Sequence, residues 1–112
     1  MAKVLKMRFG LKSATIMAIN GVLAQYPQIE QAIIYGSRAK GNYRIGSDID
    51  LTLVSDELTP QHLNRIATQL DDLLLPYSID LSLFKQIDNA DLVDHIKRVG
   101  KVFYQKTIAN AA

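Results

Sequence analysis

Residues 32–54 read AIIYGSRAKGNYRIGSDIDLTLV and carry the strongest structural signals of the sequence. Its first four residues are an apolar, β-prone run that stops at Gly36-Ser37. Its last part, residues 48–54, is a second strand candidate in which acidic and apolar residues alternate. A glycine-rich basic segment connects the two runs. The stretch therefore predicts two strands joined by a loop that carries polar groups.

The second strand is expected to have a core face and an acidic face. Side chains alternate along a strand, so Asp48 and Asp50 point to one side, and Ile49, Leu51 and Leu53 to the other. Two carboxylates about 5–7 Å apart repel by a few kcal/mol when the effective dielectric constant is about 20. A cation relieves this repulsion, and oxygen ligands suit Mg²⁺ or Mn²⁺. We therefore expect one of these ions here, with a phosphate-bearing ligand.

The glycine-serine turn is expected to hold the phosphates of that ligand. The chain leaves a strand at this turn and enters a short helical turn at residues 38–40, so backbone N–H groups and a serine hydroxyl face an anion. Basic side chains in the following loop add positive charge. The candidate phosphate-binding residues are Gly36, Ser37, Arg38 and Ser47, with Lys40 and Arg44 as further cationic candidates.

The same segment has the Gly-x₄-Gly spacing of a P-loop. A P-loop continues with Lys and then Ser or Thr, which reach the phosphates and the magnesium ion. Here Asn42-Tyr43 stands in that place, so the P-loop interpretation is set aside.

These residues carry a resemblance to a known family. Gly36-Ser37, followed after ten residues by Asp48-x-Asp50, resembles the signature of the DNA-polymerase-beta-like nucleotidyltransferase superfamily. The longer string GSRAKGNYRIGSDIDL, residues 36–51, resembles its minimal nucleotidyltransferase branch. That branch includes single-domain proteins paired with a helical HEPN protein in prokaryotic toxin–antitoxin systems. The superfamily pattern also asks for a third carboxylate on a later strand, and Asp80 in the apolar run 77–84 fits it.

The resemblance implies an α/β (α+β) fold, a small mixed sheet with helices packed on it. It also implies an enzyme that transfers a nucleoside monophosphate, AMP from ATP, to a hydroxyl of a protein or another macromolecule. Asp48, Asp50 and Asp80 would be the catalytic and Mg²⁺- or Mn²⁺-binding residues. A second copy of the chain in a homodimer, or a HEPN partner in a hetero-oligomer, would complete the site.

Two other functions share these motifs. The first is a non-catalytic antitoxin that neutralises its partner by contact. The second is a small-molecule nucleotidyltransferase that modifies an antibiotic, although such enzymes usually carry an added helical domain for the acceptor.

Length and composition limit the classes of protein to which the chain can belong. The 112 residues predict a single domain, 1–112, without a separate substrate domain. No apolar run approaches the roughly 18 residues of a membrane helix, and the first residues have no secretory apolar region. With no cysteine, a cytoplasmic location is expected. A net charge of +2 is too small for a general nucleic-acid-binding surface.

The remaining elements follow from periodicity and capping signals. Ser13 is expected to cap a helix over 13–25, in which Gly21 allows close packing, and Thr59-Pro60 begins a second helix that Pro76 stops. A strand over 77–84, a helix over 91–99 and a strand over 102–104 follow, while residues 1–12 form an arm or docking segment and residues 107–112 are disordered.

The other polar residues have ordinary interpretations. His62 and His95 are far apart in the sequence from each other and from the acids, so both are expected to be surface histidines. Asp71-Asp72 lies on a helix, where adjacent side chains diverge, and predicts a solvated face.

Overall fold

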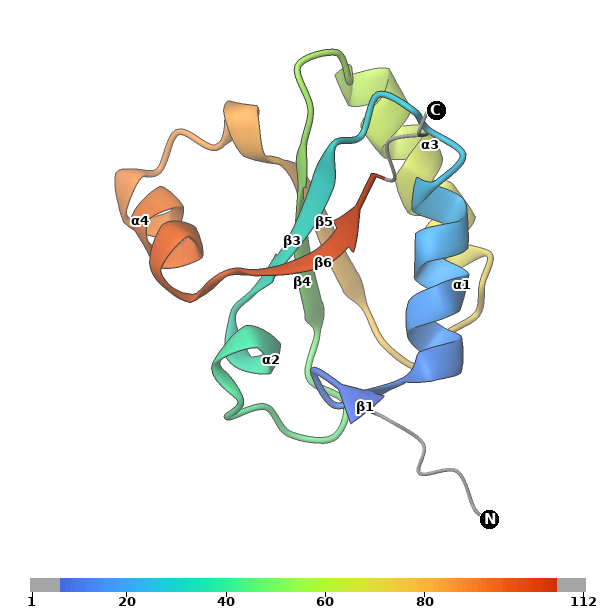
Figure 1. Ribbon diagram of the computed structural model, residues 1–112, viewed down its shortest axis with the longest axis vertical. Coiled ribbons are helices and arrows are strands. Elements are labelled where there is room, and N and C mark those ends of the chain that lie inside the picture. The colour runs from blue at the N-terminus through green and yellow to red at the C-terminus, as the bar shows by residue number, and fades with distance from the viewer. Residues whose placement is uncertain (1–6, 107–112) are drawn as a thin grey trace, which may run out of the picture.

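The fold combines a central sheet with helices on both of its faces. A computed structural model describes residues 7–106 (Figure 1). Its strands are β1 (Met7–Arg8), β2 (Leu11–Lys12), β3 (Gln31–Tyr35), β4 (Ile49–Val54), β5 (Ile79–Leu83) and β6 (Lys101–Gln105). Its helices are α1 (Ser13–Leu23), α2 (Ser37–Lys40), α3 (Pro60–Asp71), the 3₁₀ turn η1 (Phe84–Gln86) and α4 (Ala90–Val99).

The main sheet is four-stranded and mixed, with the order β5-β4-β3-β6. β3 runs antiparallel to both β4 and β6, whereas β4 and β5 are parallel. α3 makes the crossover between the two parallel strands, as such a connection requires. The predicted fold, a small mixed sheet with helices packed on it, is confirmed.

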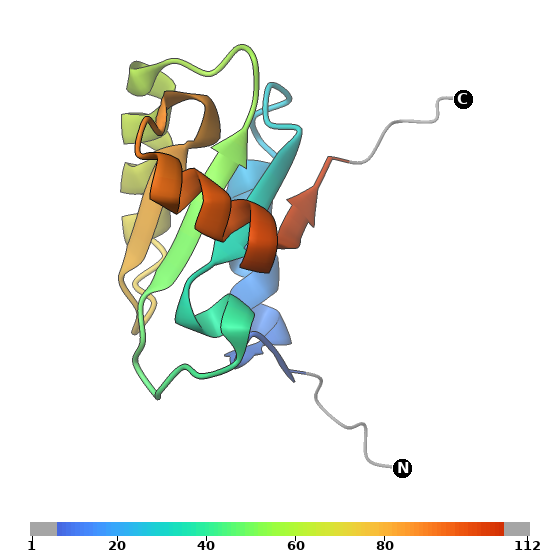
Figure 2. The ribbon, with the colours of Figure 1, turned by 90° about the vertical axis from the view of Figure 1, so that its left-hand side faces the viewer.

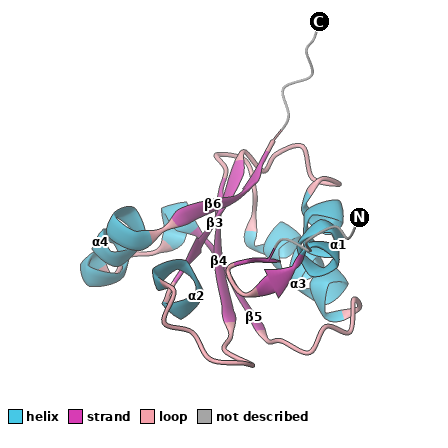
Figure 3. Ribbon diagram, turned by 60° about the horizontal axis from the view of Figure 1, so that its bottom comes forward, coloured by secondary structure: helices cyan, strands magenta, loops and turns pink. Residues whose placement is uncertain are grey.

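The two faces of the sheet are covered differently. α1 and α3 lie side by side on one face, and α2 and α4 lie on the other (Figures 1 and 3). The view turned by 90° shows α4 crossing over β3 and β4 (Figure 2). Between residues 7 and 106, no helix combines the length and the apolar character that a membrane crossing needs.

The apolar core lies between the sheet and the α1–α3 layer. On β4, Ile49, Leu51 and Leu53 are at most 1% exposed, and Ala32 and Ile34 of β3 are fully buried. Burying one Leu or Ile side chain contributes about 1.5–3 kcal/mol, so this face anchors the sheet. One face of α1 is also buried, and consists of Ile16, Ile19, Val22 and Leu23, with Tyr26 beyond the helix end.

The start of α1 differs from the prediction. Its N-cap is Lys12, and Ser13 is the first helical residue. Residues 7–12 form the β1–β2 hairpin, which places Leu11 in the core. The hairpin is thus part of the folded body, while the expectations for residues 1–6 and 107–112 lie outside the described residues.

α3 begins as predicted and ends earlier than predicted. Thr59 and His62 form a capping box, in which the Thr59 hydroxyl accepts from the His62 N–H at 3.2 Å and His62 Nδ1 accepts from the Thr59 N–H at 3.1 Å. The helix ends at Asp71, five residues before Pro76. Leu74 lies within the predicted range of this helix, but it has a φ of 55° and is 87% exposed, so that part of the prediction is wrong.

We predict opposite effects of the same substitution at two glycines. Gly21 lies in α1 with nothing within 4 Å of the position of an added Cβ, so the expected close packing is absent. Gly21→Ala should therefore raise the free energy of unfolding by about 0.5–1 kcal/mol, because alanine loses less backbone entropy in a helix. At Gly100 an added Cβ would collide with the Ile96 carbonyl oxygen and lie 2.7 Å from Ile33 Cγ2. Gly100→Ala should therefore lower the free energy of unfolding.

Urea unfolding of the two variants and the wild type measures both effects. A loss of stability in Gly21→Ala, or unchanged stability in Gly100→Ala, would contradict the packing described here.

Candidate active site

The register of two parallel strands brings two of the predicted aspartates together. Asp50 of β4 and Asp80 of β5 are direct neighbours in the register, so both side chains lie on the sheet face opposite the apolar core. On its other side Asp50 is paired with Tyr35, the last residue of β3. Asp48 immediately precedes β4. The acids and the turn at Gly36 therefore share one end of the sheet.

Gly36 is in close contact with Asp50. A Cβ added to Gly36 would collide with the Asp50 carboxylate oxygen Oδ2. Gly36 also has a φ of +74°, a conformation that other residues rarely adopt. Both the side-chain volume and the backbone therefore require glycine at this position.

Partial burial and the charges of the other two acids act on Asp50. The pKa of Asp50 is raised above its usual value, first by partial burial, and then by the negative charges of Asp80 and Asp48. Asp48 and Asp80 are exposed, while Asp50 is half-buried. The negative charge of Asp50 is therefore unfavourable unless a cation binds beside it.

The donor set fits a magnesium ion that arrives with a nucleotide. Among residues 7–106, no three His, Asp or Glu side chains are grouped closely enough to hold a metal ion as they stand. Mg²⁺ is commonly held by one or two carboxylates together with substrate phosphates, and not by an all-protein cage. Asp50 and the exposed carboxylates of Asp48 and Asp80 are oxygen donors of the kind it prefers.

The predicted glycine-serine turn is present and starts α2. The Gly36 carbonyl accepts from the N–H groups of Ala39 (3.2 Å) and Lys40 (3.0 Å), and the Ser37 carbonyl accepts from Gly41 (2.9 Å). The Gly36 N–H donates to His95 Nε2 at 3.2 Å. Ser37 therefore lies on a turn that is fixed from both sides.

The structure gives Arg38 a different role from the predicted phosphate contact. Its side chain is 3% exposed, and its guanidinium donates to the carbonyls of Ser47 (3.0 Å, from Nε) and Phe9 (2.9 Å, from an η nitrogen). The guanidinium also stacks on the rings of Tyr43 and Tyr77, 5.1 and 4.9 Å from their centroids. Arg38 braces the loop against the β1–β2 hairpin and against Tyr77, which precedes β5, and its charge is used inside the protein.

Ser47 is engaged in the same loop. Its hydroxyl accepts from the Arg44 N–H at 2.8 Å, and its own N–H donates to the Arg44 carbonyl at 3.0 Å. These contacts form the turn that leads directly into Asp48. In this arrangement Ser47 and Arg38 shape the loop, so Gly36 and Ser37 are the better phosphate candidates.

A buried polar layer lies next to the acids. Burial raises the pKa of Tyr35, and the charges of Asp80 and Asp50 add to this, while a hydrogen bond with the Ser82 side chain opposes it. The Ser82 hydroxyl in turn donates to Thr52 Oγ1 at 2.9 Å. Tyr35, Ser82 and Thr52 are thus connected by hydrogen bonds, in keeping with the rule that buried polar groups are paired.

Sequence reasoning missed His95. It was expected on the surface, but it is half-buried, bonds to Gly36 and packs edge-on against Tyr35 with ring centroids 6.2 Å apart. One signal was present: in the helix over 91–99, His95 falls between the inward residues Leu92 and Val99 at helical spacing. His62, by contrast, belongs to the α3 capping box and not to this site.

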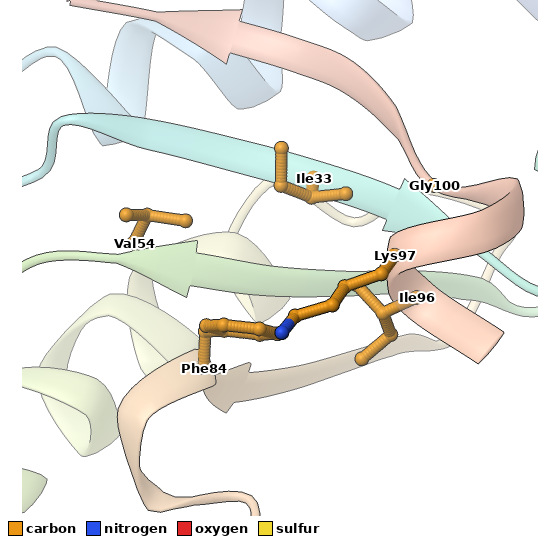
Figure 4. Close-up of a pocket in the computed structure, with 6 residues that line it drawn as sticks. All are labelled: Ile33, Val54, Phe84, Ile96, Lys97 and Gly100. Carbon is orange, nitrogen blue, oxygen red and sulfur yellow. The ribbon is translucent and has the colours of Figure 1, made fainter. Parts of the chain in front are cut away.

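A separate apolar pocket of about 320 Å³ opens farther along the same face (Figure 4). Val54 lies in it, four residues and about 13 Å along β4 from Asp50. The acids do not line this pocket. Its lining consists of Ile33, Val54, Phe84, Ile96, Lys97 and Gly100.

The fold and this end of the sheet have the organisation of a nucleotidyltransferase, with carboxylates on adjacent strands facing a glycine-serine turn. The chain belongs to the polymerase beta nucleotidyltransferase family, because the family model described as "Polymerase beta, Nucleotidyltransferase" matches residues 18–109. The predicted resemblance to this superfamily is confirmed. No curated protein matches the chain in sequence.

Solved structures share the fold at low sequence identity. A toxin–antitoxin complex with AMP-PNP contains a chain that is 20% identical, with a TM-score of 0.66, over 82% of this chain and 74% of that one. The complex of a tri-AMPylated Shewanella oneidensis HEPN toxin with an MNT antitoxin matches at 18% identity and a TM-score of 0.62. The match covers 83% of this chain and 71% of that one. A putative nucleotidyltransferase from Sulfolobus solfataricus matches at 20% identity and a TM-score of 0.52, over 80% of this chain and 76% of that one.

Replacing the arginine that braces the loop should destabilise the protein. Arg38→Met keeps most of the side-chain length but leaves the Ser47 and Phe9 carbonyls without their donor, so the free energy of unfolding should fall by about 2–4 kcal/mol. Arg98→Met is the matched control, because Arg98 is 63% exposed and forms an i,i+4 ion pair with Asp94. That variant should change stability by less than about 0.5 kcal/mol. Denaturant unfolding measures both, and equal effects would contradict the bracing role.

The raised pKa of Asp50 predicts how stability depends on pH. A carboxyl group with a higher pKa in the folded state favours folding when protonated, so this contribution is lost as the pH rises from the ordinary value of 3.8 through the folded-state pKa. At pH 7 in EDTA, Asp50→Asn should therefore melt at a higher temperature than the wild type. This gain should shrink towards pH 3. Thermal melts across that range test it, and a lower melting temperature at pH 7 would contradict the repulsion.

Proposed function

We propose that this protein is a metal-dependent adenylyltransferase that transfers AMP from ATP to a hydroxyl group of a protein or another macromolecule. The observation that carries the proposal is the in-register pair Asp50 and Asp80 beside the Gly36–Ser37 turn. Membership of the nucleotidyltransferase family supports the reaction class. The AMP-PNP in one structural neighbour and the AMPylated toxin in another support an adenine nucleotide.

The residues of the site have separate roles in this proposal. Gly36 and Ser37 contact the outgoing phosphates, so that the acceptor attacks the α-phosphorus in line. Asp48, Asp50 and Asp80 hold Mg²⁺ or Mn²⁺, which when bound would neutralise phosphate charge and lower the pKa of the acceptor hydroxyl. Asp80, exposed at the edge strand, takes the proton of the acceptor.

A helical HEPN protein is the proposed partner, with this chain as the antitoxin. The HEPN complexes among the structural neighbours support this pairing. Exposure of Asp48 and Asp80 supports it as well, because a second protein can cover the acids and exclude water from the reaction. We place the reaction in the cytoplasm, in keeping with a sequence that has no cysteine.

Label transfer tests the proposal. The protein is incubated with Mg²⁺, ATP radiolabelled at the α-phosphate and the proposed HEPN partner. Wild-type protein should label the partner, and Asp50→Asn should reduce labelling by about 100-fold or more, because charge stabilisation in the transition state is lost. Asp71→Asn is the matched control, since Asp71 is an exposed acid at the end of α3.

The control variant should label as well as the wild type, and EDTA should abolish labelling. A different outcome would contradict the proposal: the wild type labels nothing, and the Asp48→Asn, Asp50→Asn double variant still relieves HEPN toxicity. The chain would then be an antitoxin that acts by contact alone.

A further inference from the structure

The glycine-serine turn is held by a side chain from a distant helix. His95 of α4 is 59 residues away from Gly36 in the sequence, and its Nε2 accepts the Gly36 N–H at 3.2 Å. This contact requires that Nε2 carry no proton. Gly36 is thereby fixed at its amide by His95, at its Cα by the Asp50 carboxylate, and at its carbonyl by the start of α2.

The imidazole is itself well supported. Its ring packs edge-on against Tyr35, whose side chain is buried and bonded to Ser82. The next residue, Ile96, is 4% exposed and anchors α4 on the sheet. An asparagine cap at the start of α4, where Asn89 Oδ1 accepts from the Leu92 N–H at 3.0 Å, sets the helix end. His95 therefore reaches the turn from a fixed position.

We propose that His95 is a positioning residue, which holds the Gly36–Ser37 turn against Asp50 through the Gly36 amide. This inference rests on the proposed function, because the turn matters only if it holds phosphates there. The expected consequence is kinetic. If the turn binds the outgoing phosphates most tightly in the transition state, its displacement lowers kcat more than it changes the KM for ATP.

Two substitutions of His95 separate the effect of its hydrogen-bond acceptor from the effect of its aromatic ring. His95→Gln retains a hydrogen-bond acceptor near the position of Nε2 and loses the aromatic ring. His95→Phe retains a ring that can pack against Tyr35 and loses the acceptor. His62→Gln is the matched control, since glutamine keeps the α3 capping box intact and His62 is not part of the site.

Label transfer to the partner, measured over a range of Mg²⁺-ATP concentrations, gives kcat and KM for each variant. His95→Phe should lower kcat about tenfold, as expected for the loss of one hydrogen bond in the transition state, and His95→Gln should stay within about threefold of the wild type. Melting temperatures should remain within about 2 °C of the wild type, and His62→Gln should keep full activity. Wild-type kcat in His95→Phe, or equal losses in both His95 variants, would overturn the inference.

A spectroscopic readout separates this inference from the proposed function. The NMR signal of the Gly36 amide should move in His95→Phe and stay close to its wild-type position in His95→Gln, whether or not the wild type transfers label. Absence of label transfer by the wild type, with this pattern of shifts, would refute the proposed function and leave the contact established. An unmoved Gly36 amide in His95→Phe would refute the contact itself.

Discussion

The site depends on the parallel pairing of β4 with β5. This pairing sets Asp50 beside Asp80 in register, and a shift by one residue would turn one of the two acids into the apolar core. The register is held on the opposite face, where Ile49 and Leu51 are fully buried against the helical layer. Hydrophobic burial on one side of the sheet thus keeps like charges together on the other.

Much of the fold could be predicted from local patterns. The alternation in residues 48–54 identifies the core face of β4, and the spacing of α3 between two strands identifies a crossover. The end of α3 was missed because Leu73 and Leu74 continue its apolar period, although the structure turns the chain away after Asp71. Periodicity therefore indicates where a helix exists better than where it stops.

Asp48, Asp50 and the turn could be predicted because their motif lies within a short stretch of the chain, whereas Asp80 was predicted from the superfamily pattern. The structure places these residues at one end of the sheet. Contacts between distant segments were not visible in this way. Arg38 reaches Phe9, and His95 reaches Gly36 across 59 residues. An arginine in a glycine-rich loop is equally compatible with a phosphate contact and with a buried brace. For Arg38, its burial, its hydrogen bonds to two carbonyls and its stacking on two tyrosines decide between them.

The order of the strands has a consequence for synthesis on the ribosome. β6 is the last described strand to be made, yet it pairs with β3, whose other neighbour is β4. Until residues 101–105 have left the exit tunnel, β3 presents one unpaired row of N–H and C=O groups beside the apolar side chains of Ile33 and Ile34. Such an edge invites pairing with other chains, so the nascent protein passes through an aggregation-prone stage that ends when β6 pairs with β3.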